Sequence, residues 1–144
     1  MKDSKIIYIN LEQAIELHNW IINNAGGNKQ IENKDRLNNV LQEIKSDRDY
    51  PKFKHKLTQL IFAINTEPAI QDSKCLSIAL GCYFLELNGY DYVVHYFVTE
   101  MDNIVVWLGQ NKISRELLIE ITNSLIYEED YSEELKLQIV NCVS

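Results

Sequence analysis

Residues 73–89 read SKCLSIALGCYFLELNG, and this stretch decides the fold of the chain. Apolar side chains recur along it at helical spacing, and further apolar residues fill most of the remaining helix surface. The main stripe consists of Leu76, Ala79, Leu80, Tyr83, Phe84 and Leu87, and the flanking set of Ile78, Cys82 and Leu85. A helix that is apolar nearly all round is covered by other elements on most sides. The sequence therefore predicts a central, buried helix over about residues 73–88, ended by Asn88-Gly89.

Helical periodicity also marks six segments outside this stretch. Their apolar stripes run from Leu11 to Ile22, Leu37 to Ile44, Phe53 to Ile64, Val94 to Leu108, Leu117 to Leu125 and Leu135 to Val143. Asn10 with Gln13 has the form of a capping box, and Ser114 and Ser132 are placed to cap the last two helices. Gly109 is the expected end of the helix that begins near residue 94.

The segment from Tyr92 to Tyr96 departs from this pattern, because its residues favour β-structure and allow an extended conformation. No linker, repeat or low-complexity tract divides the chain. Its 144 residues have the length of one domain. We therefore predict a single all-α domain over residues 1–144, a compact bundle of six to seven helices with room for one short β element.

Composition argues against several classes of function. No apolar run approaches the roughly 20 residues of a membrane helix, and the apolar stretch at residues 6–9 is too short for a signal peptide. We therefore expect a cytoplasmic protein with no membrane partner. Three cysteines without a CxxC pair and three histidines on different segments predict no metal site and no cofactor.

The net charge of −7 is distributed unevenly along the chain. Residues 1–65 carry 10 basic and 8 acidic side chains, a net +2, whereas residues 66–144 carry 4 basic and 13 acidic ones, a net −9. An acidic surface repels nucleic acid and suits a basic protein partner. The candidate partner-binding residues are Glu128, Glu129, Asp130, Glu133 and Glu134. The alternative reading of these residues is that they only keep the protein soluble.

Two further clusters have open interpretations. Residues 52–56, Lys-Phe-Lys-His-Lys, form the one basic cluster, and a solvated helix start is the favoured reading. Tyr90, Tyr92, Tyr96 and Trp107 form either a recognition surface or the edge of the core.

Three features, in order along the chain, resemble the Doc branch of the Fic (death-on-curing) family. They are Ile9 to His18 followed by Gly26-Gly27, the segment from Lys56 to Asn65, and the run Phe84-Leu85-Glu86-Leu87-Asn88-Gly89. With the spacing from Asp102 to Ile126, the resemblance covers most of residues 8–127. It implies a Fic/Doc-like helical bundle and, in active members, transfer of a nucleotidyl or phosphoryl group from a nucleotide to a target hydroxyl.

The signature loop of that family reads His-Pro-Phe-x-Asp-Gly-Asn-Lys-Arg-Thr, and in this chain it is degenerate. Counting back from Asn88-Gly89 places residues 67–76, Glu-Pro-Ala-Ile-Gln-Asp-Ser-Lys-Cys-Leu, at the same positions. Only Pro68 and Lys74 match the pattern. The replaced positions are Glu67 for the catalytic histidine, Gln71 for the acidic or metal-binding residue, Asp72 for the small residue, Ser73 for the asparagine and Cys75 for the arginine.

These replacements remove the groups that the family's chemistry needs. A histidine exchanges protons with the target hydroxyl near neutral pH, and an arginine forms two hydrogen bonds to a phosphate. Asp72 adds negative charge where a phosphate would approach, which leaves Lys74 and Ser73 as the only candidates for nucleotide binding. We therefore expect no family-type catalytic residue.

The favoured function is protein binding, as an immunity or antitoxin-like factor that neutralises a toxin. The alternative is a divergent Doc-like toxin that transfers a phosphoryl or nucleotidyl group with Glu67 and Lys74. Both readings leave the oligomeric state open.

Overall fold

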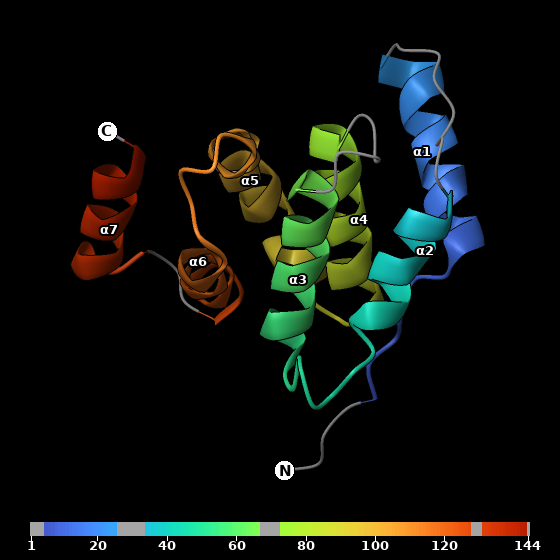
Figure 1. Cartoon of the computed structure of the whole chain (residues 1–144), viewed down its shortest axis with the longest axis horizontal. Helices are drawn as coiled ribbons and strands as arrows, with labels where there is room; N and C mark the ends of the chain where they lie inside the picture. Colours follow the sequence, from blue (N-terminus) through green and yellow to red (C-terminus); the bar gives the residue numbers. More distant parts are fainter. Residues whose placement is uncertain (1–4, 26–33, 67–72, 128–130, 144) are drawn as a thin grey trace.

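The computed structural model of the chain describes residues 5–25, 34–66, 73–127 and 131–143. Within these ranges it contains seven α-helices, one 3-10 turn and no strand (Figure 1). The helices are α1 (Leu11–Ala25), α2 (Lys34–Glu43), α3 (Phe53–Thr66), α4 (Ser73–Leu87), α5 (Val94–Gly109), α6 (Arg115–Tyr127) and α7 (Glu133–Val143). The prediction of an all-α fold is confirmed.

The segment from Tyr92 to Tyr96 is helical, so the helix predicted from Val94 is confirmed and the alternative of a short β element there is wrong. The 3-10 turn η1 covers Asp91–Val93, and α5 follows it directly. Intrinsic β-preference is weak, and burial of apolar surface overrides it. Here Phe97 is buried in the core together with the other apolar residues of α5, and only a helix places residues at this spacing on one face.

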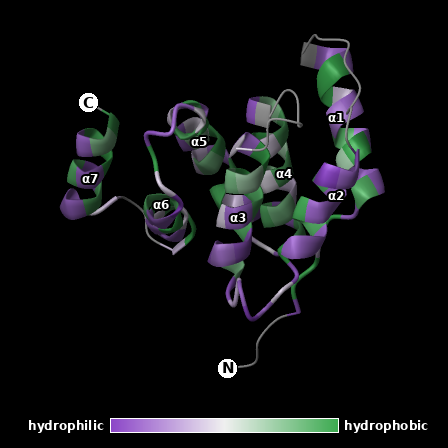
Figure 2. Cartoon of the chain, viewed as in Figure 1, coloured by the Kyte–Doolittle hydropathy of each residue, from purple (hydrophilic) through white to green (hydrophobic). Residues whose placement is uncertain are grey.

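Helices α3 and α4 together occupy the centre of the bundle. They are consecutive and run side by side in opposite directions (Figure 1). α4 also packs against α1 and α5, and α3 packs against α2, α5 and α6. α4 is mainly hydrophobic along its length, whereas α2 is largely hydrophilic (Figure 2). The buried helix predicted over about residues 73–88 is therefore confirmed as α4, and α3 is its equal in burial.

The described helices share one hydrophobic core. It gathers side chains from all seven helices, including Ala14, Leu41, Leu60, Leu80, Phe97, Leu118 and Leu135. An aromatic row runs through it, because the ring of Phe84 lies 6.2 Å from that of Tyr8 and 4.8 Å from that of Phe53, which in turn lies 4.9 Å from Tyr90. None of the described helices combines the length and apolar composition that crossing a bilayer requires.

Local side-chain caps define the starts of three helices as the sequence predicts. The backbone N–H of Gln13 donates to Asn10 Oδ1 at 2.8 Å, and the N–H of Asn10 donates to Gln13 Oε1 at 2.9 Å. Ser114 and Ser132 each accept a 3.1 Å hydrogen bond from the backbone N–H three residues later. These bonds satisfy donors that have no partner within the helix itself.

The ends of α4 and α5 share one geometry. α4 ends at Leu87, just before Asn88-Gly89, and α5 ends at Gly109, both as the sequence predicts. Gly89 has φ of +86°, and the N–H of the next residue, Tyr90, donates to the carbonyl of Leu85 at 2.8 Å. At the end of α5 the left-handed residue is Asn111, with φ of +61°, rather than Gly109. Asparagine tolerates this conformation better than most residues, so it replaces glycine in the same type of cap.

Asn88 does more than help to end α4. Its side-chain Oδ1 accepts from the backbone N–H of Ile7 at 2.9 Å, and its Nδ2 donates to the carbonyl of Ile7 at 3.0 Å. Nδ2 also reaches the carbonyl of Phe84 at 2.9 Å. The segment before α1 is therefore attached to the end of the central helix by a pair of hydrogen bonds.

Lys56 shows that the basic run at residues 52–56 is more than a solvated helix start. Its side chain is completely buried. The ammonium donates to the backbone carbonyl of Ile44 and to Asp47 Oδ1, both at 2.9 Å, and lies 5.6 Å from the centre of the Tyr8 ring. A buried charge requires such partners, so Lys56 connects α3 with the segment that follows α2.

Candidate functional site

The degenerate loop is only partly within the described residues. Glu67, Gln71 and Asp72 lie outside them, and Ser73 is the first residue of α4. Lys74 follows, and its Nζ lies 3.2 Å from Oδ1 of Asp102 in α5. The cation that would meet a phosphate therefore has a carboxylate as its partner.

Cys75, which the resemblance to the Doc/Fic family would align with an arginine, is exposed on the first turn of α4. A thiol is a weak hydrogen-bond donor and cannot replace the two parallel bonds of a guanidinium. Lys74 is thus the only cationic side chain among the described residues of the loop that could bind a phosphate.

The three histidines lie on three different helices. His18 is buried in α1, His55 lies on α3 and His95 on α5. Among the described residues, no three His, Cys, Asp or Glu side chains are grouped so that they could hold a metal ion. Burial, with a smaller contribution from Glu86, raises the pKa of Cys82 to about 11, so this thiol is protonated at neutral pH.

Two of the five acidic candidates lie at the start of α7. Glu128, Glu129 and Asp130 lie outside the described residues, whereas Glu133 and Glu134 are exposed in the first turn of this helix. Glu133 Oε2 lies 3.2 Å from Nζ of Lys136. Residues 94–144 as a whole carry 3 basic and 9 acidic side chains, a net −6. Most of the protein's net charge, −6 of −7, therefore belongs to α5, α6, α7 and their connections.

A groove of about 330 Å³ lies between α5 and α7 in this acidic part of the chain. Its lining is Thr99, Glu100, Asn103, Ile104 and Trp107 from α5, Tyr131 before α7, and Lys136, Ile139 and Val140 from α7. Apolar and aromatic side chains form much of this lining, and charged residues stand among them. Val140 is 54% exposed, and its neighbour Leu137 is 60% exposed. The α5–α7 groove thus presents apolar surface beside carboxylates.

Tyr131 and Glu100 face each other in this groove. Burial raises the pKa of the Tyr131 phenol above its usual value, and the adjacent Glu100 carboxylate raises it further. The phenol is therefore protonated throughout the physiological range and presents a donor beside a carboxylate acceptor. The phenol oxygen is buried from solvent, so this pair belongs to the wall of the groove.

Comparisons of the chain with protein-family models, with curated proteins and with solved structures find no match. The resemblance to the Doc/Fic family therefore rests on the quoted residues alone. Of its three segments, the one from Lys56 to Asn65 lies within α3, and the one from Phe84 to Gly89 covers the end of α4 and the turn that follows it.

The four aromatic residues considered as one recognition surface divide into two groups. Tyr90 packs edge-on against Tyr127, with 6.2 Å between ring centres, and the neighbouring Tyr92 is 73% exposed. Trp107 instead lies in the α5–α7 groove. Tyr96, also in α5, lies close enough to Tyr131 to contribute to the rise in the pKa of that phenol, so Trp107 and Tyr96 belong to the α5–α7 side of the protein.

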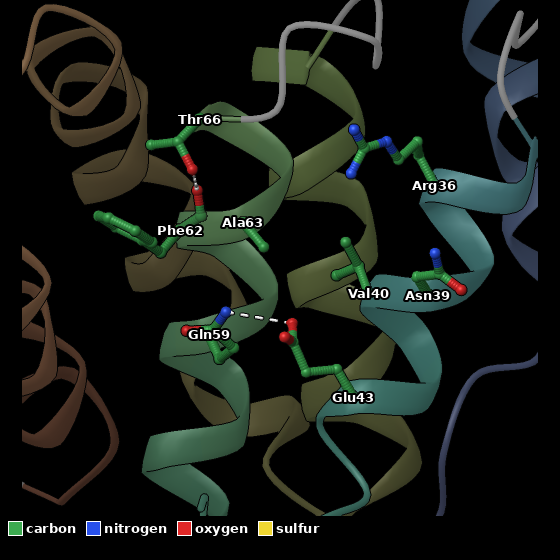
Figure 3. Close-up of a pocket in the computed structure, with 8 residues that line it drawn as sticks. All are labelled: Arg36, Asn39, Val40, Glu43, Gln59, Phe62, Ala63 and Thr66. Atoms are coloured by element: carbon green, nitrogen blue, oxygen red, sulfur yellow. Dashed lines mark hydrogen bonds between the residues drawn. The ribbon is translucent and has the colours of Figure 1, made fainter.

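A second pocket, of about 250 Å³, lies between α2 and α3 (Figure 3). Its lining is Arg36, Asn39, Val40 and Glu43 from α2, and Gln59, Phe62, Ala63 and Thr66 from α3. Gln59 Nε2 donates to Glu43 Oε1 at 3.2 Å, and Gln59 Oε1 accepts from Nη1 of Arg115 at 2.7 Å. Arg115 extends from α6, with its guanidinium 5.8 Å from the centre of the Tyr50 ring. A chain of polar side chains thus supports the wall of the α2–α3 pocket.

Sequence reasoning did not predict either pocket. For the α5–α7 groove the available signal was Leu137 and Val140, two apolar residues that do not belong to the buried stripe of α7. For the α2–α3 pocket it was Arg36 and Glu43, opposite charges two helical turns apart on one face. Neither pattern shows which other helix forms the opposite wall of the pocket, because that depends on how the helices pack.

Proposed function

We propose that this chain acts by binding another protein, as an immunity or antitoxin-like factor that neutralises a basic toxin. The observation that carries this proposal is an apolar groove within the most acidic part of the chain. Residues 94–144 hold a net −6, and the α5–α7 groove within them contains Trp107 and Tyr131. Aromatic anchors in a partly desolvated groove, surrounded by charged residues, are typical of the hot spots of protein interfaces.

The charge indicates the kind of partner. A protein that acts on nucleic acid or another polyanion carries a basic surface at its own active site. An acidic binder is attracted to that surface, so charge accelerates their encounter and directs the binder to the site. The groove would then supply the apolar contacts that slow dissociation.

On this proposal the scaffold is Doc/Fic-like and no longer performs the transfer reaction. Two features of α4 support this: Lys74 is paired with Asp102, and Cys75 stands where the family has an arginine. Cooperating catalytic groups act as a unit, so the loss of several together removes most of the rate enhancement.

Replacing Trp107 with alanine should weaken partner binding by about 2 kcal/mol or more, which is roughly 30-fold in Kd. The partner is first recovered by affinity capture on the full chain and then titrated by isothermal calorimetry. Val140→Asp, at an exposed position of the same groove, should also weaken binding without the risk of unfolding that the truncation of a half-buried tryptophan carries. Melting curves establish that each variant is folded.

Tyr92→Ala is the matched control, because it removes an exposed aromatic residue outside the groove. It should change Kd less than about threefold. Raising the salt concentration should slow association, and Glu133→Lys with Glu134→Lys should reduce that salt dependence. If neither Trp107→Ala nor Val140→Asp changes the affinity for the partner, the groove is not the binding site. If affinity capture on the full chain recovers no specific basic protein, the proposed function is wrong.

The alternative, a divergent transferase toxin, makes a different prediction. A nucleotide at about 100 times its Kd would stabilise the fold by about 2.7 kcal/mol, which raises the melting temperature by several degrees. Because Lys74 is paired with Asp102, we expect no such shift with ATP or other nucleotides, with or without Mg²⁺. Asp102→Ala removes the ion-pair partner of Lys74, so this variant would show weak nucleotide binding more readily than the wild-type chain in the same titration. A shift that Lys74→Ala abolishes, together with toxicity of the chain expressed alone, would favour the transferase.

A further inference from the structure

We propose that the α5–α7 groove binds one short amphipathic helix of the partner protein, which turns an apolar face toward the groove and carries basic residues beside that face. The proposal rests on the protein-binding function proposed above and names the element of the partner that is recognised. Binding of an amphipathic helix between two helices of a receptor is a common mode of protein recognition.

The wall formed by α5 is long enough for two turns of such a helix. Thr99, Asn103 and Trp107 follow one another at intervals of four residues, so they lie along one face of α5. From the first to the last of them the helix rises about 12 Å, which is roughly two turns. The buried residues Ile104 and Ile139 line the groove between the two walls.

The opposite wall, α7, leaves apolar surface open to solvent. This helix packs mainly on α6 and lies at the edge of the bundle (Figure 1). Val140 lines the groove and is largely exposed, and Trp107 faces it from α5. Apolar side chains of a partner helix would cover both residues, and removal of this surface from water favours binding.

The backbone of the two walls favours a helical occupant over an extended one. An extended peptide gains most of its affinity from backbone hydrogen bonds with a sheet edge, and the described residues contain no strand. Along α5 and α7 the backbone N–H and C=O groups are bonded within their own helices. A helix bonds its own backbone groups, so it needs only side-chain contacts from the groove.

The charges around the groove favour a basic occupant. Glu100 lines it, and Glu133 and Glu134 are exposed in the first turn of α7. Lys136 is the one cationic side chain among the described residues of the lining, and its Nζ lies 3.2 Å from Glu133 Oε2. Residues 94–144 carry a net −6, so charge repulsion disfavours an acidic helix and a second copy of this chain.

The test uses three synthetic peptides of about 14 residues, roughly four helical turns. The first places leucine at positions i, i+3, i+4 and i+7 and lysine elsewhere. The second has the same composition in an order that forms no apolar face, and the third replaces each lysine of the first with glutamate. Each is titrated into the full chain carrying Trp20→Phe, a change at an exposed residue that leaves Trp107 as the only tryptophan.

The amphipathic basic peptide should change the fluorescence of Trp107 saturably, with a Kd on the order of 10 µM. Its helical circular dichroism should increase on binding, because a short isolated helix is only marginally stable in water. The scrambled and the acidic peptides should bind at least about tenfold more weakly.

Two variants on the surface of α7 locate the bound peptide. Val140→Lys removes apolar surface and adds a like charge, so it should weaken binding of the amphipathic basic peptide at least about tenfold. Lys136→Glu removes the cation of the lining and should strengthen that binding about threefold. Lys52→Glu makes the same change of charge at an exposed residue before α3 and is the control, which should change Kd less than about twofold.

Three results overturn the proposal. They are the absence of saturable binding of the amphipathic basic peptide, equal binding of this peptide and its scrambled form, and binding that neither Val140→Lys nor Lys136→Glu changes. None of them decides the proposed function, because a captured basic partner whose affinity depends on Trp107 would then occupy the groove with a segment that is not helical. The peptides are titrated without that partner, so failure to capture one leaves their result unchanged.

Discussion

Replacing Lys56 with alanine should lower the free energy of unfolding by about 3–5 kcal/mol. The first cause is the backbone carbonyl of Ile44, which loses the ammonium donor and costs about 1–3 kcal/mol when left buried without a partner. The second cause is the cavity left by the four-carbon stem, which is completely buried and packs near Tyr8. Urea unfolding followed by circular dichroism measures the change.

Three further variants separate these causes. Lys56→Met retains the stem and removes the charge, so it should cost only about 1–3 kcal/mol for the unpaired carbonyl. Asp47→Ala removes the other partner of the ammonium, but the Asp47 side chain is 84% exposed, so this change should cost less than about 1 kcal/mol. Lys52→Ala, at an exposed lysine of the same basic run, is the control and should cost under about 0.5 kcal/mol. A loss below about 1 kcal/mol for Lys56→Ala would show that the buried ammonium does not support the fold.

Replacing Gly81 with valine should destabilise the protein by about 3 kcal/mol, because the core has no room for a side chain there. A Cβ atom at this position would lie 2.6 Å from Cζ and 2.9 Å from Cε2 of Phe97. The ring of Phe97 is itself buried and cannot move into solvent. The packing of Phe97 from α5 against α4 therefore depends on the absence of a side chain at residue 81.

Gly109→Val is the matched control, because a Cβ at Gly109 would meet no atom within 4 Å. It should change the free energy of unfolding by less than about 0.5 kcal/mol. Gly81→Ala alone should also destabilise the protein. Adding Phe97→Leu should restore part of that lost stability, because the shorter leucine side chain removes the clash with the new Cβ. Equal effects of valine at Gly81 and at Gly109 would contradict the proposed close contact.

The sequence alone determined the features of this protein that depend on neighbours within one turn of a helix. The apolar stripes predicted for α2, α3 and α6 are buried, and the caps at Asn10, Ser114 and Ser132 form as predicted. Such features are readable because their partners lie three or four residues away in the chain. The end of α5 at Gly109 is a local feature of the same kind and is confirmed, and the left-handed residue that follows it is Asn111.

The candidate sites were predicted less well. Of the acidic residues proposed for partner binding, only Glu133 and Glu134 lie within the described residues, and the structure adds a neighbouring groove that contains Trp107. Of the degenerate loop, Lys74 was identified as the remaining cation, but its pairing with Asp102 joins α4 to α5 across 28 residues. No periodicity along one helix contains that information.

Tertiary structure alone decided which side chains meet across helices. Lys56 reads as a surface residue in a basic run, and it is buried because the carbonyl of Ile44 and the carboxylate of Asp47 lie where its ammonium ends. Gly81 reads as a weak point in a helix, and it is required because Phe97 packs against it. Local sequence selects the conformation of each helix, whereas the shape and polarity of its surroundings come from residues distant in the chain, which no short-range pattern encodes.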